Sequence, residues 1–257
     1  MTTSLVTGAS AGIGRAFATQ LAARGHDVVL VARDAVRLEA LARELHDLHH
    51  VDVEVLPADL VTGDGRAAVE ARVADVARPV DLLVNNAGFG TYGAFADADV
   101  AHEVDEIELN VVTLVRLTHV AMNAMRARHA GAILNISSVA GYQPAPSSAT
   151  YAATKAFVNS FTHSVHEEAR RAGVHVLLVC PGYTHTEFHA RAGLGPSRLP
   201  ELVWQSADEV ATRALRDLDR GRSVSVPGWV NRTVSAASSV TPAVVSRRVA
   251  GLVVRRT

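Results

Sequence analysis

Short apolar runs alternate with longer amphipathic stretches along this chain, and the alternation limits its fold more than any other feature. Seven runs have the length and composition of β-strands: 3–7, 27–32, 51–57, 80–84, 131–137, 174–179 and 222–226. Most are separated by stretches of helix length, such as 34–49, where leucines recur at near-helical spacing. The runs at 28–31 and 177–179 are apolar throughout, which is typical of strands buried on both faces. We therefore expect one α/β domain with a single Rossmann-like, doubly wound parallel sheet and helices on both faces.

The composition excludes several classes of protein. Of the 257 residues, 48% are hydrophobic and 20% charged, and the net charge of −1 gives no indication of a nucleic-acid partner. The single cysteine, Cys180, excludes an internal disulfide and ends an apolar run, as a buried thiol would. No secretory leader or membrane span is visible, so we expect a cytoplasmic protein. Histidines at 46–50 and 163–166 lack the partners of a defined metal site, and we expect no metal.

Three glycines follow the first strand-like run with the spacing Gly-x-x-x-Gly-x-Gly. Glycine allows a tight turn and a close approach of the backbone to a pyrophosphate, and the helix that follows presents free N–H groups to phosphate. Any one glycine could merely end a strand. Together they indicate a dinucleotide site at Gly8, Ser10, Gly12, Ile13 and Gly14.

Tyr151 and Lys155 are one helical turn apart, and Ser138 lies thirteen residues before the tyrosine. A phenol has an ordinary pKa of about 10, and a nearby ammonium lowers that pKa by favouring the phenolate. The i, i+4 spacing places both side chains on one helix face. The pair alone is a weak signal, because an alanine-rich helix can carry it by chance.

Together these residues resemble the short-chain dehydrogenase/reductase family, from about residue 3 to about residue 226. Its further motifs occur in order as Asp59-Leu60, Asn85-Asn86-Ala87-Gly88, Asn110, Ser138, Tyr151, Lys155, Pro181-Gly182 and Thr186. The resemblance implies that residues 1–226 form an NADP-binding, Rossmann-type catalytic domain with a substrate flap at about 183–205. Residues 227–257 would be a basic, amphipathic extension of the same domain.

The resemblance implies a catalytic set of Asn110, Ser138, Tyr151 and Lys155. Tyr151 would protonate a carbonyl oxygen or deprotonate the matching alcohol, and Lys155 would lower the pKa of that phenol and bind the nicotinamide ribose. Ser138, chosen over Ser137 for its spacing from Tyr151, would hydrogen-bond the substrate oxygen. Asn110 would hold Lys155 through an ordered water. Taken singly, Asn110 could equally be a helix cap and Ser138 a strand-end cap.

The remaining cofactor contacts are also implied by the resemblance. Asp59 and Leu60 would flank the adenine, and Thr186 could reach the nicotinamide carboxamide. Besides Tyr151 and Lys155, the expected set is Gly8, Ser10, Gly12, Ile13, Gly14, Arg33, Asp59, Leu60, Asn86, Ala87, Gly88, Pro181, Gly182, Thr184 and Thr186.

The end of the second strand-like run bears on the choice of nicotinamide. Ala32 stands where NAD-preferring relatives carry an aspartate, and Arg33 could clamp a 2′-phosphate with charge-assisted bonds. Ala11 replaces a basic residue of many NADP-preferring relatives, and Asp34 follows the arginine directly. Arg33 could also be a solvated surface charge. We expect NADP(H) to be preferred over NAD(H).

The positions that should face the substrate are mostly apolar or aromatic. They are Phe89, Ser138, Tyr142, Gln143, Tyr151, Tyr183 and Phe188. A hydrophobic ketone or aldehyde is therefore expected, with NADPH-dependent reduction or oxidation of the matching secondary alcohol. An epimerase-like use of the same site and a catalytically weak NADP-binding sensor or scaffold are the alternatives.

Two further surfaces bear on partners. A small and apolar stripe lies along the helix predicted at 148–172, and in the family this region forms a dimer face, so we expect a homodimer or homotetramer. Part of the stripe could instead pack on the sheet. The segment 227–257 carries arginines but no acid. Packing on the domain or a neighbouring subunit is favoured over contact with a membrane surface.

Overall fold

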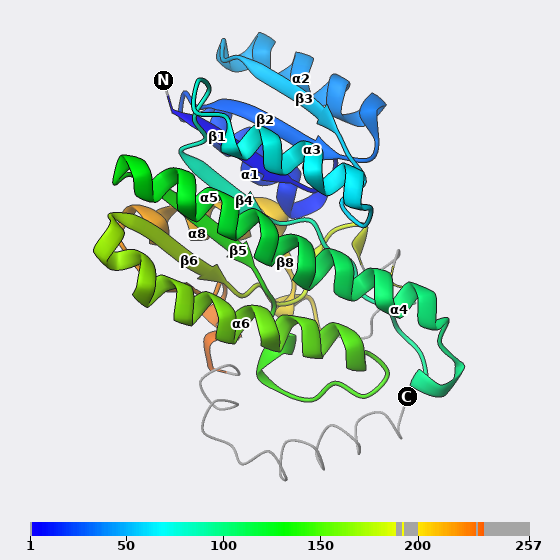
Figure 1. The fold of residues 1–257 in the computed structure, drawn as a ribbon. Coiled ribbons are helices and arrows are strands. Elements are labelled where there is room, and N and C mark those ends of the chain that lie inside the picture. Colours follow the sequence, from blue (N-terminus) through cyan, green and yellow to red (C-terminus); the bar gives the residue numbers. More distant parts are fainter. Residues whose placement is uncertain (1, 189–191, 193–199, 230, 234–257) are drawn as a thin grey trace.

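Seven parallel strands form one sheet in the order β3-β2-β1-β4-β5-β6-β9 (Figure 1). The computed structural model describes residues 2–188, 192, 200–229 and 231–233. The strands are β1 (Thr3–Thr7), β2 (Asp27–Ala32), β3 (Val53–Pro57), β4 (Leu82–Asn85), β5 (Gly131–Ile136), β6 (Val174–Val179) and β9 (Val224–Ser225). The strand order changes direction between β1 and β4, which confirms the predicted doubly wound sheet.

Helices cover both faces of this sheet (Figure 1). They are α1 (Gly12–Ala22), α2 (Ala35–His49), α3 (Gly63–Ala74), α4 (Val100–Ile107), α5 (Leu114–Arg128), α6 (Ala149–Ala169) and α8 (Ala207–Asp219). One hydrophobic core packs α1, α2 and α8 on the sheet through residues such as Phe17, Leu38 and Leu215. A second core packs α3 and α5 on the opposite face through Val69 and Leu117. Burial on both faces explains why the strands are apolar throughout.

Four strand boundaries differ from the prediction. The run at 51–57 becomes a strand only at Val53, because α2 continues to His49 and His50 ends it in the left-handed conformation with φ 55°. Residues 51–52 therefore connect α2 to β3. The other three runs appear as Leu82–Asn85, Gly131–Ile136 and Val224–Ser225.

A small second sheet joins the two ends of the predicted substrate flap. β7 (Thr184–His185) pairs with β8 (Gln205–Ser206) in parallel, an interaction that the sequence did not reveal. Residues 189–191 and 193–199 of the flap lie outside the described residues, as do 234–257 of the C-terminal segment, so both predictions stay predictions.

Within the described ranges, no helix has the length and apolar character needed to cross a membrane. Nor do three His, Cys, Asp or Glu side chains of that part of the chain gather in a way that could hold a metal ion.

The carboxyl ends of the parallel strands bring the sequence motifs together. β1 leads into the glycine loop, β4 into Asn86, β5 into Ser138 and β6 into Pro181. Because parallel strands all end at the same edge of a sheet, these four segments lie at one edge, where ligands of such sheets bind beside the change in strand order.

Candidate active site

The glycine loop between β1 and α1 has the shape that a pyrophosphate requires. Gly8 has a φ of 67°, and a Cβ on Gly14 would overlap the carbonyl oxygen of Gly8. The N-cap position of α1 is Ala11, which provides no side-chain cap, and the first turn contains no acidic residue. The first N–H groups and the positive end of the helix dipole are thus available to an anion, so the loop fits the phosphates of a dinucleotide.

Thr7 joins this loop to the segment after β4. Its hydroxyl accepts hydrogen bonds from the backbone N–H groups of Asn86 and Ala87, both at 2.9 Å, and donates to the Val84 carbonyl at 3.2 Å. The Asn86 amide donates to the Thr7 carbonyl at 2.9 Å. A Cβ on Gly8 would lie 2.8 Å from that amide nitrogen. The two cofactor-binding segments therefore hold each other at a fixed separation.

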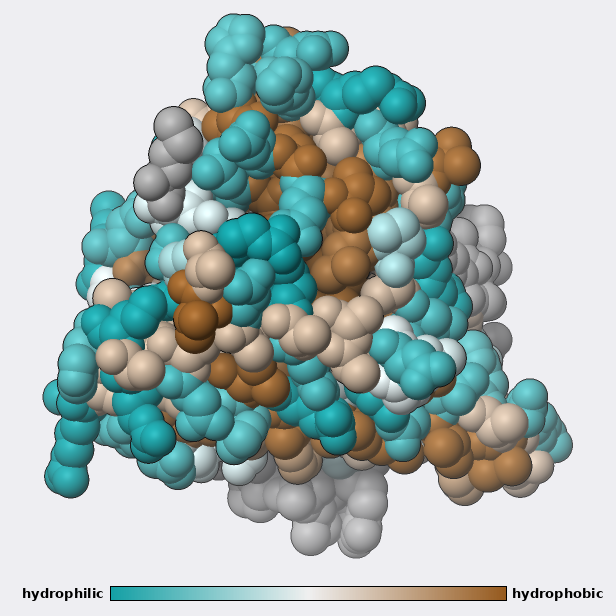
Figure 2. All heavy atoms as spheres, turned by 45° about the horizontal axis from the view of Figure 1, so that its top comes forward, coloured by the Kyte–Doolittle hydropathy of each residue, from teal (hydrophilic) through white to brown (hydrophobic). Residues whose placement is uncertain are grey.

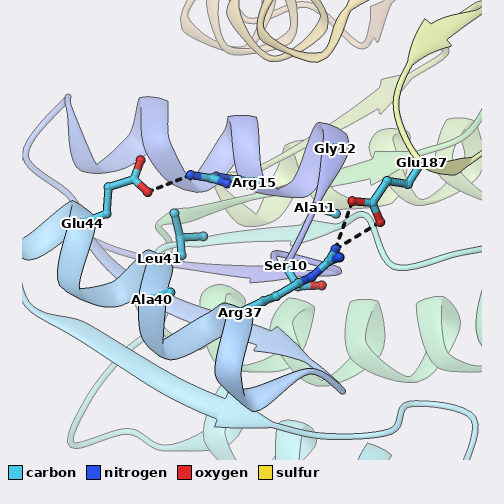
Figure 3. A pocket seen from close by; sticks show the side chains of 9 residues that line it. All are labelled: Ser10, Ala11, Gly12, Arg15, Arg37, Ala40, Leu41, Glu44 and Glu187. Atoms are coloured by element: carbon cyan, nitrogen blue, oxygen red, sulfur yellow. Dashed lines mark hydrogen bonds and ion pairs between the residues drawn. The ribbon is translucent and has the colours of Figure 1, made fainter.

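A cavity of about 280 Å³ lies between the glycine loop and α2 (Figure 3). Ser10 and Gly12 line one side and Arg37 the other. The Arg37 guanidinium donates to both carboxylate oxygens of Glu187, at 3.0 and 3.1 Å, so an ion pair connects α2 to the base of the flap. The structure thus places a second arginine, which we did not predict, beside the glycine loop.

Arg33 lies at the end of β2 with its side chain exposed. It makes no ion pair or side-chain hydrogen bond with any residue that the structure describes. The neighbouring Asp34 has a structural role, since its carboxylate caps α2 by accepting a hydrogen bond from the Arg37 N–H at 3.0 Å. Asp34 therefore stabilises the start of α2, and Arg33 remains available to bind a phosphate.

The loop after β3 is fixed by hydrogen bonds of the Asp59 and Thr113 side chains. Asp59 accepts a hydrogen bond from the Val61 N–H at 3.1 Å, and the Leu60 carbonyl accepts one from the Thr113 hydroxyl at 2.7 Å. Asp59 is half-buried and Leu60 buried. Both lie at the sheet edge where the resemblance places the adenine.

Ser138, Tyr151 and Lys155 come together at the start of α6. The Ser138 side chain lies close enough to the Tyr151 phenol to lower its pKa. The Lys155 Nζ lies 5.7 Å from the centre of the Tyr151 ring and donates to the Ile136 carbonyl at 3.0 Å. Ser137 instead donates to the Lys155 carbonyl at 3.0 Å, which fixes α6 against β5. The two serines thus have separate positions, and Ser138 is the one that reaches the phenol.

Burial is the largest influence on the pKa values of Tyr151 and Lys155. It raises the pKa of Tyr151 to about 12, opposed by the Ser138 side chain, and it lowers the pKa of Lys155 to about 8. The lowering of the phenol pKa that we predicted from the Tyr–Lys spacing is therefore not produced by the protein groups alone. At neutral pH the phenol is a proton donor and the lysine is mostly an ammonium.

Asn110 lies in a π-helical turn, Glu108–Thr113, between α4 and α5. Its amide accepts from the Phe89 N–H at 3.2 Å and donates to the Phe89 carbonyl at 2.8 Å and to the Thr154 hydroxyl at 3.2 Å. A Cβ on Gly88 would lie 2.7 Å from the Asn110 Oδ1 and 3.6 Å from the Lys155 Nζ. Asn110 is therefore not a simple helix cap, and only a glycine fits between it and the lysine.

The segment after β6 closes the nicotinamide end. The Pro181 carbonyl accepts from the Val139 N–H at 3.0 Å, and Thr184 donates to the Gly182 carbonyl at 3.0 Å. A Cβ on Gly12 would lie 3.0 Å from the Thr186 methyl carbon. Thr186 is thus placed directly across from the glycine loop.

The predicted substrate positions fall into two groups. The Phe188 ring lies 5.5 Å from the Tyr151 ring, and the Tyr142 hydroxyl lies 3.5 Å from the Cys180 sulfur. By contrast, the Tyr183 ring lies 5.5 Å from the Trp204 ring in a tilted arrangement, Phe89 stacks on His102, and Gln143 is exposed. Phe188 therefore borders the Tyr151 ring directly.

Several residues of this site gave no sequence signal that we used. Each acts through a partner far away in the chain, or through burial that periodicity does not reveal. They are Thr7, Arg37, Thr91, Glu106 and Thr154. Only Glu106 had a local clue, since it lies one helical turn before Asn110.

A parallel sheet with an uncapped glycine loop and a Tyr–Lys pair at its carboxyl edge is the architecture of a nicotinamide-dependent oxidoreductase. The family model described as "short chain dehydrogenase" matches residues 2–195, and the chain belongs to this family of dehydrogenases and reductases. The family binds a nicotinamide cofactor and acts on small substrates.

Three similar proteins illustrate the match. A very-long-chain 3-oxoacyl-CoA reductase from Bos taurus is 34% identical over 241 residues, covering 88% of this chain and 76% of that protein. A short-chain dehydrogenase from Sphingobium yanoikuyae, solved in complex with NADPH, is 38% identical with a TM-score of 0.85, covering 94% and 96% of the two chains. A bulky-bulky ketone specific alcohol dehydrogenase from Comamonas testosteroni is 31% identical with a TM-score of 0.81, covering 94% and 95%.

Proposed function

We propose that this enzyme reduces a hydrophobic ketone or aldehyde with NADPH, or oxidises the matching secondary alcohol, with Tyr151 as the proton-transferring group. One observation carries the proposal. The Tyr151 phenol lies beside Ser138 and the buried Lys155, at the edge of the sheet that also holds the glycine loop.

The bound nicotinamide supplies a hydride to the carbonyl carbon. Tyr151 donates its phenolic proton to the carbonyl oxygen, which becomes the alcohol hydroxyl. The Ser138 hydroxyl orients that oxygen, and the Lys155 ammonium stabilises the phenolate that the transfer leaves behind. Asn110 fixes the loop at Phe89 on the other side of the phenol. A proton from solvent then restores the neutral phenol.

The preference for NADPH rests on two arginines. Arg33 is exposed and unpaired among the described residues, and Arg37 borders the cavity beside the glycine loop. Arg33 is positioned to attract a 2′-phosphate, since the neighbouring acid Asp34 caps α2. Arg37 is ion-paired with Glu187, which also lines the cavity, so its contribution is the smaller one. The NADPH bound to the Sphingobium protein supports this preference.

The substrate class follows from the side chains around Tyr151. Phe188 and Tyr142 are aromatic, and the exposed Tyr183 contacts the partly buried Trp204 at the flap base. The names of the relatives, a very-long-chain oxoacyl thioester reductase and a bulky ketone dehydrogenase, support a large apolar substrate.

A homodimer through α4 and α6 completes the proposal. The residues of the predicted stripe are exposed except for the partly buried Phe161: Ala153, Ala156, Phe157, Ser160 and Ser164. The stripe therefore faces away from the sheet, and α4 beside it exposes Val104 by 50% and Ile107 by 42%. Apolar surface gathers at the lower right of Figure 2, where Figure 1 places the start of α4. Contiguous apolar surface of this kind is typical of a subunit interface.

The test is an NADPH-oxidation screen over hydrophobic ketones, aldehydes, steroids and 3-oxoacyl thioesters, compared with charged ketones. We expect turnover with at least one hydrophobic carbonyl and little with the charged set. Tight NADPH binding without turnover on any carbonyl would instead support the sensor or scaffold.

A further inference from the structure

Glu106, near the end of α4, is a completely buried carboxyl group beside the Tyr–Lys pair. An ionised carboxylate is costly to bury unless hydrogen bonds or a nearby cation stabilise it. Among the described residues, no cation lies within ion-pair distance of it. Hydrogen bonds from neighbouring groups must therefore offset the cost of burying Glu106.

Its oxygens bind two different segments of the active site. One accepts hydrogen bonds from the N–H group and the hydroxyl of Thr91, at 3.1 and 2.9 Å, and the other accepts from the Asn110 amide at 3.4 Å. Thr91 adjoins Gly90, where a Cβ would lie 2.9 Å from the Tyr151 ring. Glu106 thus ties the loop that borders the phenol to the helix that carries Asn110.

The charge of Glu106 also reaches Lys155. Burial raises the pKa of Glu106 to about 7, and Glu103 on the same helix raises it further, while Thr91 and Lys155 oppose the shift. In return, Glu106 raises the pKa of Lys155 against the effect of burial. It raises the pKa of Tyr151 as well. The titratable groups that act on this cluster come from α4, from α6 and from the end of β6, where Cys180 also raises the pKa values of Tyr151 and Lys155.

We propose that Glu106 is a positioning residue that anchors Asn110 and sets the charge state of Lys155. The carboxylate holds the lysine as an ammonium at pH values where burial alone would deprotonate it. The ammonium is the form that can stabilise a phenolate, so Glu106 extends the pH range of proton transfer upward. The consequence for turnover rests on the proposed function, whereas the titration of Lys155 can be measured without any substrate.

The chain offers an unusually direct test, because Lys155 is its only lysine. Enzyme labelled with ¹³C at the lysine ε-carbon gives one side-chain NMR signal, whose shift with pH reports the protonation of Lys155. Glu106→Gln removes the charge with little change of shape. Glu103→Gln removes a charge one turn earlier on α4, from a buried group that acts on Glu106 and is not among the groups that shift Lys155.

In Glu106→Gln the lysine signal should titrate at clearly lower pH than in the wild type, and in Glu103→Gln it should not move downward. Thr91→Val keeps the charge but removes a hydrogen bond that lowers the carboxyl pKa, so it should give a smaller shift in the same direction as Glu106→Gln. This variant also serves if Glu106→Gln does not fold. Superimposable titrations of the wild type and Glu106→Gln, or an equal shift in Glu103→Gln, would overturn the proposal.

A kinetic readout separates the two proposals. With a substrate in hand, kcat of Glu106→Gln should fall at alkaline pH sooner than kcat of the wild type, with KM for NADPH little changed. If the lysine signal shifts as expected and no substrate is turned over, Glu106 still sets the charge of Lys155 and only the proposed function fails.

Discussion

An alanine at position 14 should disable the cofactor site through a steric conflict that the surrounding atoms cannot relieve. Gly14 lies in the first turn of α1, where an added Cβ would overlap the Gly8 carbonyl oxygen and lie 2.5 Å from the Asn86 Nδ2. The first of these atoms is backbone. The second is held by its hydrogen bond to the Thr7 carbonyl at 2.9 Å, so α1 or the loop must move instead.

The size of the effect follows from the crowding. Overpacking of this kind costs about 1–3 kcal/mol, and each kcal/mol lowers the melting temperature of a domain of this size by roughly 2–4 °C. Gly14→Ala should therefore melt about 2–12 °C below the wild type. Gly63→Ala is the matched control, since Gly63 begins α3 and a Cβ there meets nothing within 4 Å. That variant should melt at or slightly above the wild-type temperature.

Thermal denaturation with and without NADPH distinguishes loss of binding from loss of stability. At a concentration of about 100 Kd, the cofactor should stabilise the wild type by about 2.7 kcal/mol, or roughly 5–10 °C. Gly14→Ala should lose most of this gain, whereas Gly63→Ala should keep it. A Gly14→Ala protein that melts like the wild type and shows the full cofactor shift would refute the reasoning.

Three further experiments test separate parts of the structure. Arg33→Ala should lower kcat/KM for NADPH by about 10–100-fold through loss of charge-assisted bonds, and Arg37→Ala should lower it by a smaller factor. In both variants kcat/KM for NADH should change little, and equal losses with both cofactors would contradict the assignment. Phe157→Asp should convert a species of twice the 27.2 kDa chain mass to monomer in light scattering, whereas Leu48→Asp, at an exposed apolar site on α2, should not. Glu106→Gln should gain stability relative to the wild type as pH rises from about 4.5 to 7. Because the pKa of Glu106 is raised in the folded protein, folding favours the protonated acid. The contribution of this group to wild-type stability is therefore complete below its unfolded pKa and declines as pH rises to about 7. A pH-independent difference between the two melting temperatures would exclude this ionisation.

The sheet and the glycine loop could be predicted because each follows from local pattern. Apolar runs without alternation identify strands buried on both faces, and glycine spacing identifies the phosphate turn. The contacts that complete the site depend on chain folding over long distances. Arg37 and Glu187 are 150 residues apart, and Thr7 meets Asn86 across 79. The periodicity of apolar residues in the sequence gives no information about such distant pairs.

The electrostatics of the Tyr–Lys pair were predicted only in part. The helical spacing correctly placed Lys155 beside Tyr151, but the depth of burial, which governs both pKa values, is set by α4, β5 and the loop after β4 together. Glu106 was missed for the same reason. A charged residue on a predicted amphipathic helix is ordinarily exposed, and only the packing of α4 on α6 buries this one.

The central claim is that Tyr151 delivers the proton to the substrate carbonyl, and the turnover number of Tyr151→Phe tests it most directly. The measurement is kcat for NADPH-dependent reduction of the best hydrophobic ketone, with the Kd for NADPH determined on the same preparation. We expect kcat to fall by about 10²–10⁴-fold or more while the Kd for NADPH stays close to the wild-type value. A phenylalanine variant that binds NADPH normally and keeps kcat within about tenfold of the wild type would contradict the claim.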